Sequence, residues 1–267
     1  MNIKYRNKDF KIDGVSQEDH IYKTIVKQHG FYEIDLLEYM YSIKRYLHGG
    51  IKIAIDVGAN IGNHSIFFRS FLTDYVIAIE PNPEVLPILY KNINQNINNF
   101  VIYDNALGEH DSVGKLVVRD GAQCNLGMAR IEIAPDANDN VINIITLDSV
   151  IGDIRQKHHI EGNVSLIKVD VEGMELAVLR GAKNTIETHK PHLFVEAATH
   201  EEFKELDNFL GNLGYKMLSR WASTHVYHFC YNPPKSLLIT VRSIKFYRAI
   251  MKIKAKVLRR LKLLAKR

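Results

Sequence analysis

The stretch Ile51-Lys-Ile-Ala-Ile-Asp-Val-Gly-Ala-Asn-Ile-Gly-Asn-His-Ser65, continued by Val76-Ile-Ala-Ile-Glu-Pro-Asn-Pro83, decides the fold. Its apolar start predicts a strand, Gly58 and Gly62 interrupt that strand, and helical spacing of apolar residues follows. The second stretch predicts another strand, with Glu80 at its end before a proline-rich turn. A βαβ unit with glycines in the first turn and an acid after the second strand predicts a nucleoside site.

The spacing of the glycines distinguishes between two kinds of nucleoside ligand. Dinucleotide-binding loops carry Gly-x-Gly-x-x-Gly and face an anionic pyrophosphate. Here three residues separate Gly58 from Gly62, and Asp56 stands just before them. A carboxylate at this place repels a pyrophosphate and attracts a ligand that carries an ammonium and a sulfonium. The loop therefore favours S-adenosylmethionine, with an NAD-dependent sugar-nucleotide oxidoreductase as the alternative.

The length and composition fit one α/β domain with two appendages. The chain has 267 residues, 46% of them hydrophobic and 24% charged, as in globular proteins. We expect an N-terminal extension and helix over residues 1–48, a nucleoside-binding domain over 49–234, and a basic amphipathic helix over 235–267. The two cysteines, Cys124 and Cys230, form no disulfide framework and no zinc motif.

The positive charge is concentrated at the C-terminus. Residues 241–267 hold eleven of the 35 lysines and arginines and no acid, which leaves 24 basic and 30 acidic residues elsewhere. A general nucleic-acid binder is therefore not predicted. Apolar residues share one face of this basic helix, which suits an anionic membrane surface or self-association through residues 241–267. Packing on the domain is the alternative.

The N-terminus lacks the apolar region of a signal peptide, and no apolar run reaches the length that spans a bilayer. We therefore expect a cytoplasmic protein, with peripheral attachment to the inner face of the membrane as a further expectation from the basic helix.

Outside the nucleoside motif, the pattern predicts the following order of elements. Residues 1–20 suggest a hairpin, and residues 34–47 a helix that either packs on the sheet edge or covers a substrate pocket. Short alternating segments between Gly108 and Val150 predict a β-rich insertion beside the crevice. The last predicted elements are a helix over 201–213 and an antiparallel pair of strands, the second of which spans 226–231.

Acidic residues end four predicted strands: Asp56, Glu80, Asp170 and Glu196. The carboxyl ends of parallel strands meet at one edge of a sheet, where ligands bind. A purely structural sheet rarely places so many charges at the ends of buried strands. The four acids therefore predict a functional crevice.

Each candidate residue has an expected role in this crevice. Asp170 is the first candidate for removing a proton from the acceptor or orienting it, and Glu172 and Glu196 are its neighbours. We expect Glu175 to stabilise the start of one continuous helix whose apolar stripe runs to Ile186. Cofactor contacts are expected from the following residues: Asp56, Gly58, Asn60, Gly62, Ser65, Glu80, Asn82 and Asn105.

Within this set the glycine loop would hold the methionine part of the cofactor, Glu80 the ribose, and Asn105 the adenine side. His64 is expected to be a surface or loop residue. Paired carboxylates can also hold a divalent metal ion that acidifies a hydroxyl, but no ligand spacing requires one.

With these pieces in order, the sequence resembles the FkbM-type methyltransferase family of class I S-adenosylmethionine-dependent enzymes. The motifs that carry the resemblance lie within roughly residues 50–197. They are residues 55–65, Ile79-Glu-Pro-Asn-Pro83, Asn105-Ala-Leu-Gly108, Ile145-Thr-Leu-Asp148 and Ile167-Lys-Val-Asp-Val-Glu-Gly-Met-Glu175.

The resemblance implies a doubly wound, mostly parallel, seven-stranded Rossmann-like sheet with a reversed last hairpin. It also implies O-methylation of a hydroxyl on a sugar, glycan or glycolipid, or on a small natural product. A nucleoside- or RNA-binding protein without turnover is the alternative outside the enzymes.

Overall fold

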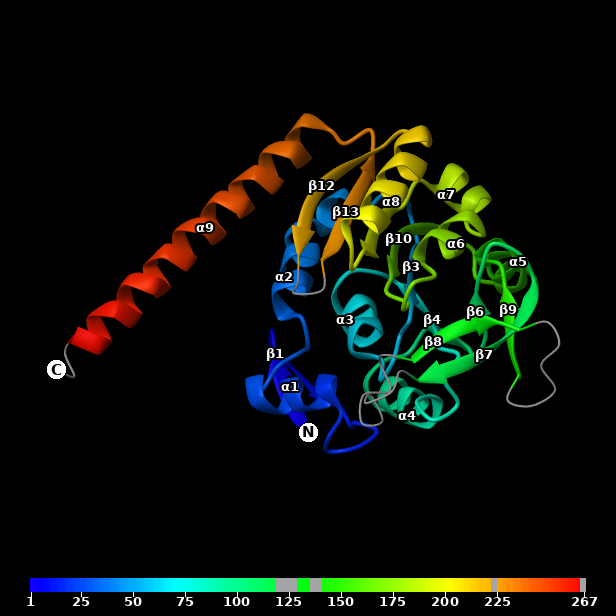
Figure 1. Cartoon of the computed structure of the whole chain (residues 1–267), viewed down its shortest axis with the longest axis horizontal. Coiled ribbons are helices and arrows are strands. Elements are labelled where there is room, and N and C mark those ends of the chain that lie inside the picture. Colours follow the sequence, from blue (N-terminus) through cyan, green and yellow to red (C-terminus); the bar gives the residue numbers. More distant parts are fainter. Residues whose placement is uncertain (119–128, 135–140, 222–224, 265–267) are drawn as a thin grey trace.

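A seven-stranded sheet forms the centre of the computed structural model, which describes residues 1–118, 129–134, 141–221 and 225–264 (Figure 1). The strands are β3 (Lys52–Val57), β4 (Tyr75–Ile79), β5 (Phe100–Tyr103), β10 (Asn163–Val169), β11 (His192–Glu196), β12 (Tyr215–Trp221) and β13 (Val226–Tyr231). Their order is β12-β13-β11-β10-β3-β4-β5, and β13 alone runs opposite to the other strands of this sheet. The expected Rossmann-like sheet with a reversed last hairpin is confirmed.

Helices cover both faces of this sheet, because successive side chains of a strand point to opposite sides. Ala54 of β3 belongs to one hydrophobic cluster, whereas its neighbours Ile53 and Ile55 belong to the other. The first cluster contains residues of α2 (Ile34–Ser42), α3 (Asn63–Phe71) and α4 (Leu86–Asn96). The second contains residues of α5 (Leu147–Lys157), α6 (Glu175–Arg180), α7 (Lys183–His189) and α8 (His200–Asn212).

The single helix expected after Asp170 is instead divided into α6 and α7. The division lies at Gly181, where an added Cβ would stand 2.0 Å from the carbonyl oxygen of Gly108. The close approach of the two backbones therefore requires a glycine at this position. The predicted apolar stripe is still buried on either side of the break, at Leu179 and Ile186.

The predicted β-rich insertion is confirmed as a second, four-stranded sheet of order β6-β9-β7-β8. Its strands are β6 (Ala106–Leu107), β7 (Ser112–Val118), β8 (Ala129–Ile133) and β9 (Val141–Ile145). This sheet follows directly after β5, at the end of the central sheet where the nucleoside motif lies (Figure 1).

The N-terminal residues form the expected hairpin, β1 (Asn2–Tyr5) and β2 (Lys8–Lys11), followed by α1 (His20–Gln28), α2 and a short 3-10 helix, Lys44–Tyr46. Tyr39 of α2 is buried: its ring stacks on Trp221 of edge strand β12 at 4.3 Å, and its hydroxyl lies 2.6 Å from His228 Nδ1. Helix α2 thus packs at the sheet edge, which is the first of its two expected roles.

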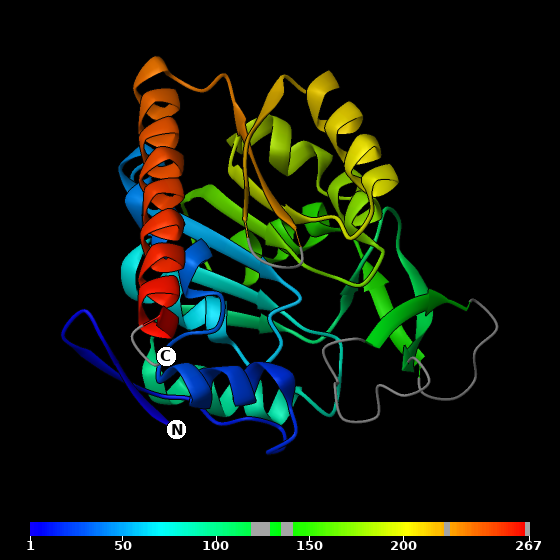
Figure 2. The ribbon, with the colours of Figure 1, turned by 60° about the vertical axis from the view of Figure 1, so that its left-hand side comes forward.

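The C-terminal helix α9 (Lys235–Leu264) leaves this edge and runs out past the rest of the structure (Figure 1), and the turned view shows it as one straight helix (Figure 2). Its first turns are anchored: Leu237 and Val241 are buried, and Arg248 lies over the Trp221 ring at 3.8 Å. No helix in the described ranges combines the length and the apolar character needed to cross a bilayer.

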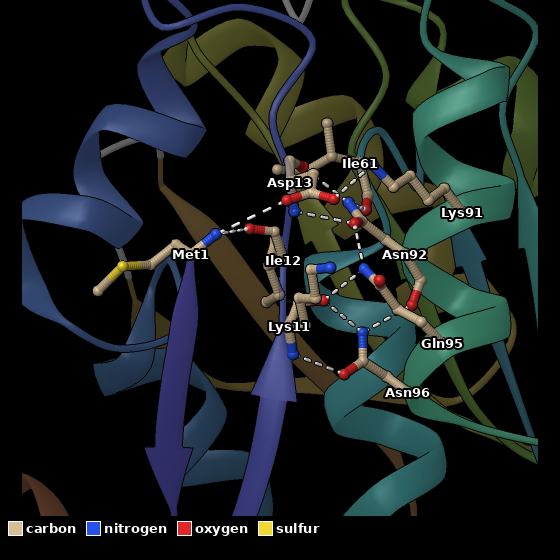
Figure 3. Close-up of polar contacts among 9 residues, drawn as sticks. All are labelled: Met1, Lys11, Ile12, Asp13, Ile61, Lys91, Asn92, Gln95 and Asn96. Atoms are coloured by element: carbon tan, nitrogen blue, oxygen red, sulfur yellow. Dashed lines mark hydrogen bonds and ion pairs between the residues drawn. The ribbon is translucent and has the colours of Figure 1, made fainter.

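A group of asparagines fastens the N-terminal segment to the nucleoside domain (Figure 3). Asn92 of α4 is completely buried; its Oδ1 accepts the N–H of Asp13, and its Nδ2 donates to the carbonyls of Asp13 and Ile61. Asn96 likewise binds both backbone groups of Lys11. Because Ile61 lies in the glycine loop, one side chain connects the N-terminal segment to that loop.

We expect Asn92→Ala to lower the free energy of unfolding by about 2–4 kcal/mol, because buried backbone groups of Asp13 and Ile61 lose their partner. Urea unfolding measures this change. Asn94→Ala is the matched control: Asn94 is exposed and bonds only within its own helix, so its change should stay within about 0.5 kcal/mol. Equal effects of the two substitutions would contradict the role of Asn92.

Candidate active site

A cavity of about 620 Å³ opens at the carboxyl ends of β3, β4 and β10. Its charged and amide lining residues come from the ends of strands: Glu80, Asn82, Asn105, Arg130, Asp170 and Glu172. Leu116 of β7 and Ile131 of β8 add apolar surface, so the insertion forms part of the wall. Three carboxyl groups against one guanidinium make this lining acidic.

The glycine loop brings the backbone of β3 close to that of β10. Gly58 has φ of 78°, and an added Cβ would lie 1.9 Å from the Asp170 carbonyl oxygen, so both the conformation and the space require glycine. Gly62 also has positive φ and precedes α3. Asn60 between them adopts the left-handed conformation too. The loop therefore turns sharply under the cavity.

Glu80 is held by the backbone of two loops. Its Oε2 accepts the N–H of Asn60 at 2.8 Å and its Oε1 that of Asn82 at 2.9 Å. Burial raises the pKa of Glu80 to about 7, although both N–H groups oppose this shift. Asn82 Nδ2 is buried and has no hydrogen-bond acceptor in the described part of the chain. The turn after β4 thus presents a fixed acid next to an unused donor.

Lys168 of β10 is a buried cation between two carboxyl groups. Its Nζ lies 2.7 Å from Asp170 Oδ2 and 3.9 Å from Asp56 Oδ1. Asp56 Oδ2 accepts a hydrogen bond from the Ser65 hydroxyl at 2.6 Å. Burial opposes the charge of Lys168, but Asp170 and Asp56 outweigh it and raise the pKa of the ammonium. The two central strands are thereby joined by charge at their carboxyl ends.

Asp170 and Glu196 hold different protonation states. Burial favours the neutral form of Asp170, yet the Lys168 ammonium and a hydrogen bond from Glu196 lower its pKa well below the usual range. Burial and the interaction with ionised Asp170 raise the pKa of Glu196 to about 10. At neutral pH, Asp170 is therefore the carboxylate of the pair and Glu196 the acid that donates to it.

The structure distributes the candidate residues over two layers. Those that line the cavity are Gly58, Glu80, Asn82, Asn105, Asp170 and Glu172. Asp56 and Ser65 are fully buried in the layer below and bond to each other, while Asn60 and Gly62 shape the loop. Glu175 is buried in the first turn of α6, and burial raises its pKa to about 8.

The expectation that His64 is a surface residue is wrong. Its side chain is 8% exposed, and Nε2 lies 3.3 Å from Oε2 of Glu33, whose side chain is 6% exposed. Glu33 comes from the N-terminal segment, so no local pattern around His64 indicates this contact. Lys168 was also missed as a site residue; a single lysine in the otherwise apolar run 166–169 is the signal that points to it.

No group of histidine, cysteine, aspartate and glutamate side chains suited to a metal ion occurs among the described residues. Cys230 is buried and has a free thiol. Cys124 lies outside the described residues.

Comparison with known families identifies residues 56–217 as a methyltransferase FkbM domain. The chain belongs to this family. The matched region is more than half of the chain and runs from Asp56 through the cavity-lining loops to β12. No curated protein sequence matches the chain.

One solved structure of this family shares the fold. A methyltransferase FkbM structure from Methylobacillus flagellatus matches with a TM-score of 0.50 and 20% identity, over 72% of this chain and 48% of that one. The chain therefore spans about half the length of that relative. A precorrin-6y C5,15-methyltransferase from Geobacter metallireducens matches with a TM-score of 0.41, 14% identity and coverage of 73% and 86%.

A Streptococcus mutans protein that is described as a methyltransferase and was solved with SAH matches with a TM-score of 0.42 and 14% identity. The match covers 74% of this chain and 95% of that one.

The paired acids lead to a pH prediction. Glu196 keeps its proton in the folded protein. In the unfolded chain this side chain loses the proton near the ordinary glutamate pKa of 4.5. Its contribution to stability is therefore complete below that pH and is lost as the pH rises toward 10. Glu196→Gln keeps an N–H donor for Asp170 but cannot ionise.

Between about pH 6 and 9, the free energy of unfolding of Glu196→Gln should thus decline less steeply than that of the unsubstituted protein, by up to about 1 kcal/mol per pH unit. Urea unfolding at several pH values gives both slopes. Exposed Glu187→Gln is the control and should leave the slope unchanged. Parallel slopes for Glu196→Gln and the unsubstituted protein would refute this protonation state.

Proposed function

We propose that the protein is an S-adenosylmethionine-dependent O-methyltransferase whose acceptor is a hydroxyl of a sugar, glycan or glycolipid. The observation that carries this proposal is the acidic cavity at the ends of β3 and β4, in a chain of the FkbM methyltransferase family. A methyl ether of a small natural product is the closest alternative within the same chemistry.

The cavity residues suit the proposed cofactor better than a dinucleotide. Glu80 stands where its carboxylate can accept hydrogen bonds from ribose hydroxyls, and the unused Asn82 Nδ2 is a donor beside it. Apolar Ile79 and Leu107 offer surface to an adenine ring. The carboxyl groups of Glu80, Asp170 and Glu172 favour a cationic ligand and disfavour an anionic pyrophosphate.

The bound cofactor supplies a methyl group that is already activated by the positive sulfur. The chain therefore has to orient the acceptor oxygen in line with that methyl group and receive the hydroxyl proton. Asp170 is ionised at the cavity wall and can accept a hydrogen bond from the acceptor hydroxyl. Its lowered pKa makes it a weak base, so orientation is the role that we assign to it.

Titration calorimetry tests the cofactor. We expect S-adenosylmethionine to bind and NAD not to bind, and Glu80→Gln to weaken S-adenosylmethionine about 10- to 100-fold through the lost ribose contact. Glu84→Gln, an exposed acid in the same turn, should bind like the unsubstituted protein. Incubation with labelled methyl donor and a panel of glycans, glycolipids, RNA and phenols then shows the acceptor. Binding of NAD alone, or label in RNA alone, would refute the proposal.

We further propose that α9 attaches the enzyme to an anionic membrane surface, where lipid-linked glycans are found. Ile239, Phe246 and Ile253 are spaced by seven residues, so they share one helix face, and they are 63%, 70% and 63% exposed. Residues 241–267 carry eleven basic residues and no acid. Exposed apolar side chains on a basic helix are the combination that binds anionic lipid surfaces.

Vesicle co-sedimentation tests this attachment. The protein should pellet with vesicles that contain phosphatidylglycerol, less so at high salt, and should not pellet with pure phosphatidylcholine. Replacing Phe246 and Ile253 together by serine should abolish pelleting, whereas exposed Ala249→Ser should have no effect. Pelleting that survives the double substitution would refute the proposal. It would also be refuted if the protein did not bind vesicles and instead formed a dimer that the double substitution dissociates.

A further inference from the structure

The four-stranded insertion supplies one wall of the cavity. Leu116 of β7 and Ile131 of β8 both line it. The two residues are direct partners in the register of these strands, so their side chains share one face of the small sheet. On that face they pack against Ala106, which directly follows Asn105. The wall therefore lies on the Asn105 side of the cavity.

This wall adds apolar surface that the strand ends lack. Ile79 and Leu107 line the same part of the cavity but are only 1% and 4% exposed, so they offer a small area to a ligand. Leu116 and Ile131 are half-buried and offer more. A purine base has two broad apolar faces and a polar edge, and it needs apolar contacts for the faces and a hydrogen-bonding partner for the edge. Asn105 is suited to the edge, and the insertion to a face.

The charge that the insertion carries at the cavity is already engaged. Arg130 also lines the cavity, but the register pairs it with Val117, on the opposite face of the small sheet from Leu116. Its guanidinium bonds to the carboxylate of Glu132 on the same strand. The face that carries Leu116 thus presents apolar side chains, which suit an uncharged base better than a phosphate group.

Both ends of the insertion are fastened to the helices beside the central sheet. Near its start, Glu109 Oε2 lies 3.1 Å from Nη1 of Arg180 in α6. After its last strand, the N–H of Asp148 donates to the Gly181 carbonyl at 3.0 Å. The Asp148 carboxylate also accepts the N–H of Thr185 in α7 at 2.8 Å. The position of the wall is therefore set by the fold.

The remaining half-buried apolar side chains of the cavity lie at its other end. Val171 and Met174 closely follow Asp170, the residue to which we assign orientation of the acceptor. An acceptor held by Asp170 would meet these two side chains, whereas the insertion stands beside Asn105. The apolar lining is thus divided between an acceptor end and a base end.

We propose that Leu116 and Ile131 are specificity-determining residues for the cofactor, and that their side chains pack on its adenine ring and cover the base end of the cavity. This inference rests on the proposed function, because it assumes that S-adenosylmethionine binds with its base beside Asn105. It assigns to the insertion the recognition of the cofactor rather than of the acceptor.

Methyl NMR of the unsubstituted protein tests the contact directly. The methyl groups of leucine and isoleucine are labelled with ¹³C, and S-adenosylhomocysteine, which carries the same base, is added to saturation. Nuclei over the face of an aromatic ring move upfield, so the Leu116 and Ile131 signals should do so. Ile133 is 63% exposed and does not line the cavity, so its signal should stay in place. Each signal is identified by its loss in the alanine variant. Unmoved Leu116 and Ile131 signals with bound ligand would overturn the inference.

Calorimetry measures what the contact contributes. Leu116→Ala and Ile131→Ala should each weaken S-adenosylhomocysteine about 5- to 10-fold, because each loses part of the apolar area that covers the base. Ile142→Ala is the matched control for loosening of the insertion: Ile142 is 8% exposed in the same small cluster but does not line the cavity. It should bind with unchanged affinity, as should Ile133→Ala. Equal weakening by Ile142→Ala and Leu116→Ala would reduce the role of the wall to a structural one.

Turnover separates recognition of the cofactor from recognition of the acceptor. With an acceptor found in the labelled panel, Leu116→Ala and Ile131→Ala should raise the KM of S-adenosylmethionine and leave that of the acceptor unchanged. A raised KM for the acceptor, with unchanged affinity for S-adenosylhomocysteine, would show that the wall contacts the acceptor and would overturn the inference. If the unsubstituted protein does not bind S-adenosylmethionine, the proposed function itself fails; if it binds and the wall variants bind equally well, only this inference fails.

Discussion

The site depends on one buried cation. Lys168 places its ammonium between Asp56 and Asp170, at the point where the two central strands β3 and β10 end side by side. A charge in this position is costly unless it is paired, and an unpaired partner would be costly as well. The pairing therefore fixes the ends of both strands, and with them the glycine loop that closes over Asp170 at Gly58.

The acids around this cation differ in their protonation states. Asp170, 2.7 Å from the Lys168 ammonium, remains ionised, whereas Glu196, which donates a hydrogen bond to Asp170, keeps its proton. Glu80, buried but further from the cation, has a pKa near neutrality and is held by backbone N–H groups. These three acids thus differ in protonation because of their surroundings alone.

The N-terminal segment is built into this arrangement. It reaches the glycine loop through Asn92 and Ile61, and it reaches the start of α3 through Tyr32 and Asn63. Its hydrophobic residues belong to the same cluster as those of α3 and α4. Movement of this segment would therefore disturb both the glycine loop and the Glu33–His64 pair.

The sequence by itself determined the sheet, the β-rich insertion and the edge at which the four acids meet. These features follow from local patterns, namely alternating apolar residues, glycines at a turn and acids at strand ends. Each pattern lies within a short run of consecutive residues. It did not reveal the break between α6 and α7, where the Gly181 carbonyl accepts the N–H of Asp148 and the Asp148 carboxylate accepts the N–H groups of Asn184 and Thr185 at the start of α7.

Only the tertiary structure decided which side chains face one another. Asp56 and Ser65 are buried beneath the cavity rather than lining it, and His64 is buried against Glu33 from a segment outside the nucleoside motif. The protonation states of Asp170 and Glu196, which are opposite, likewise depend on Lys168 and on burial. Such contacts join residues far apart in the chain, and the electrostatics of a buried group depend on all its neighbours in space.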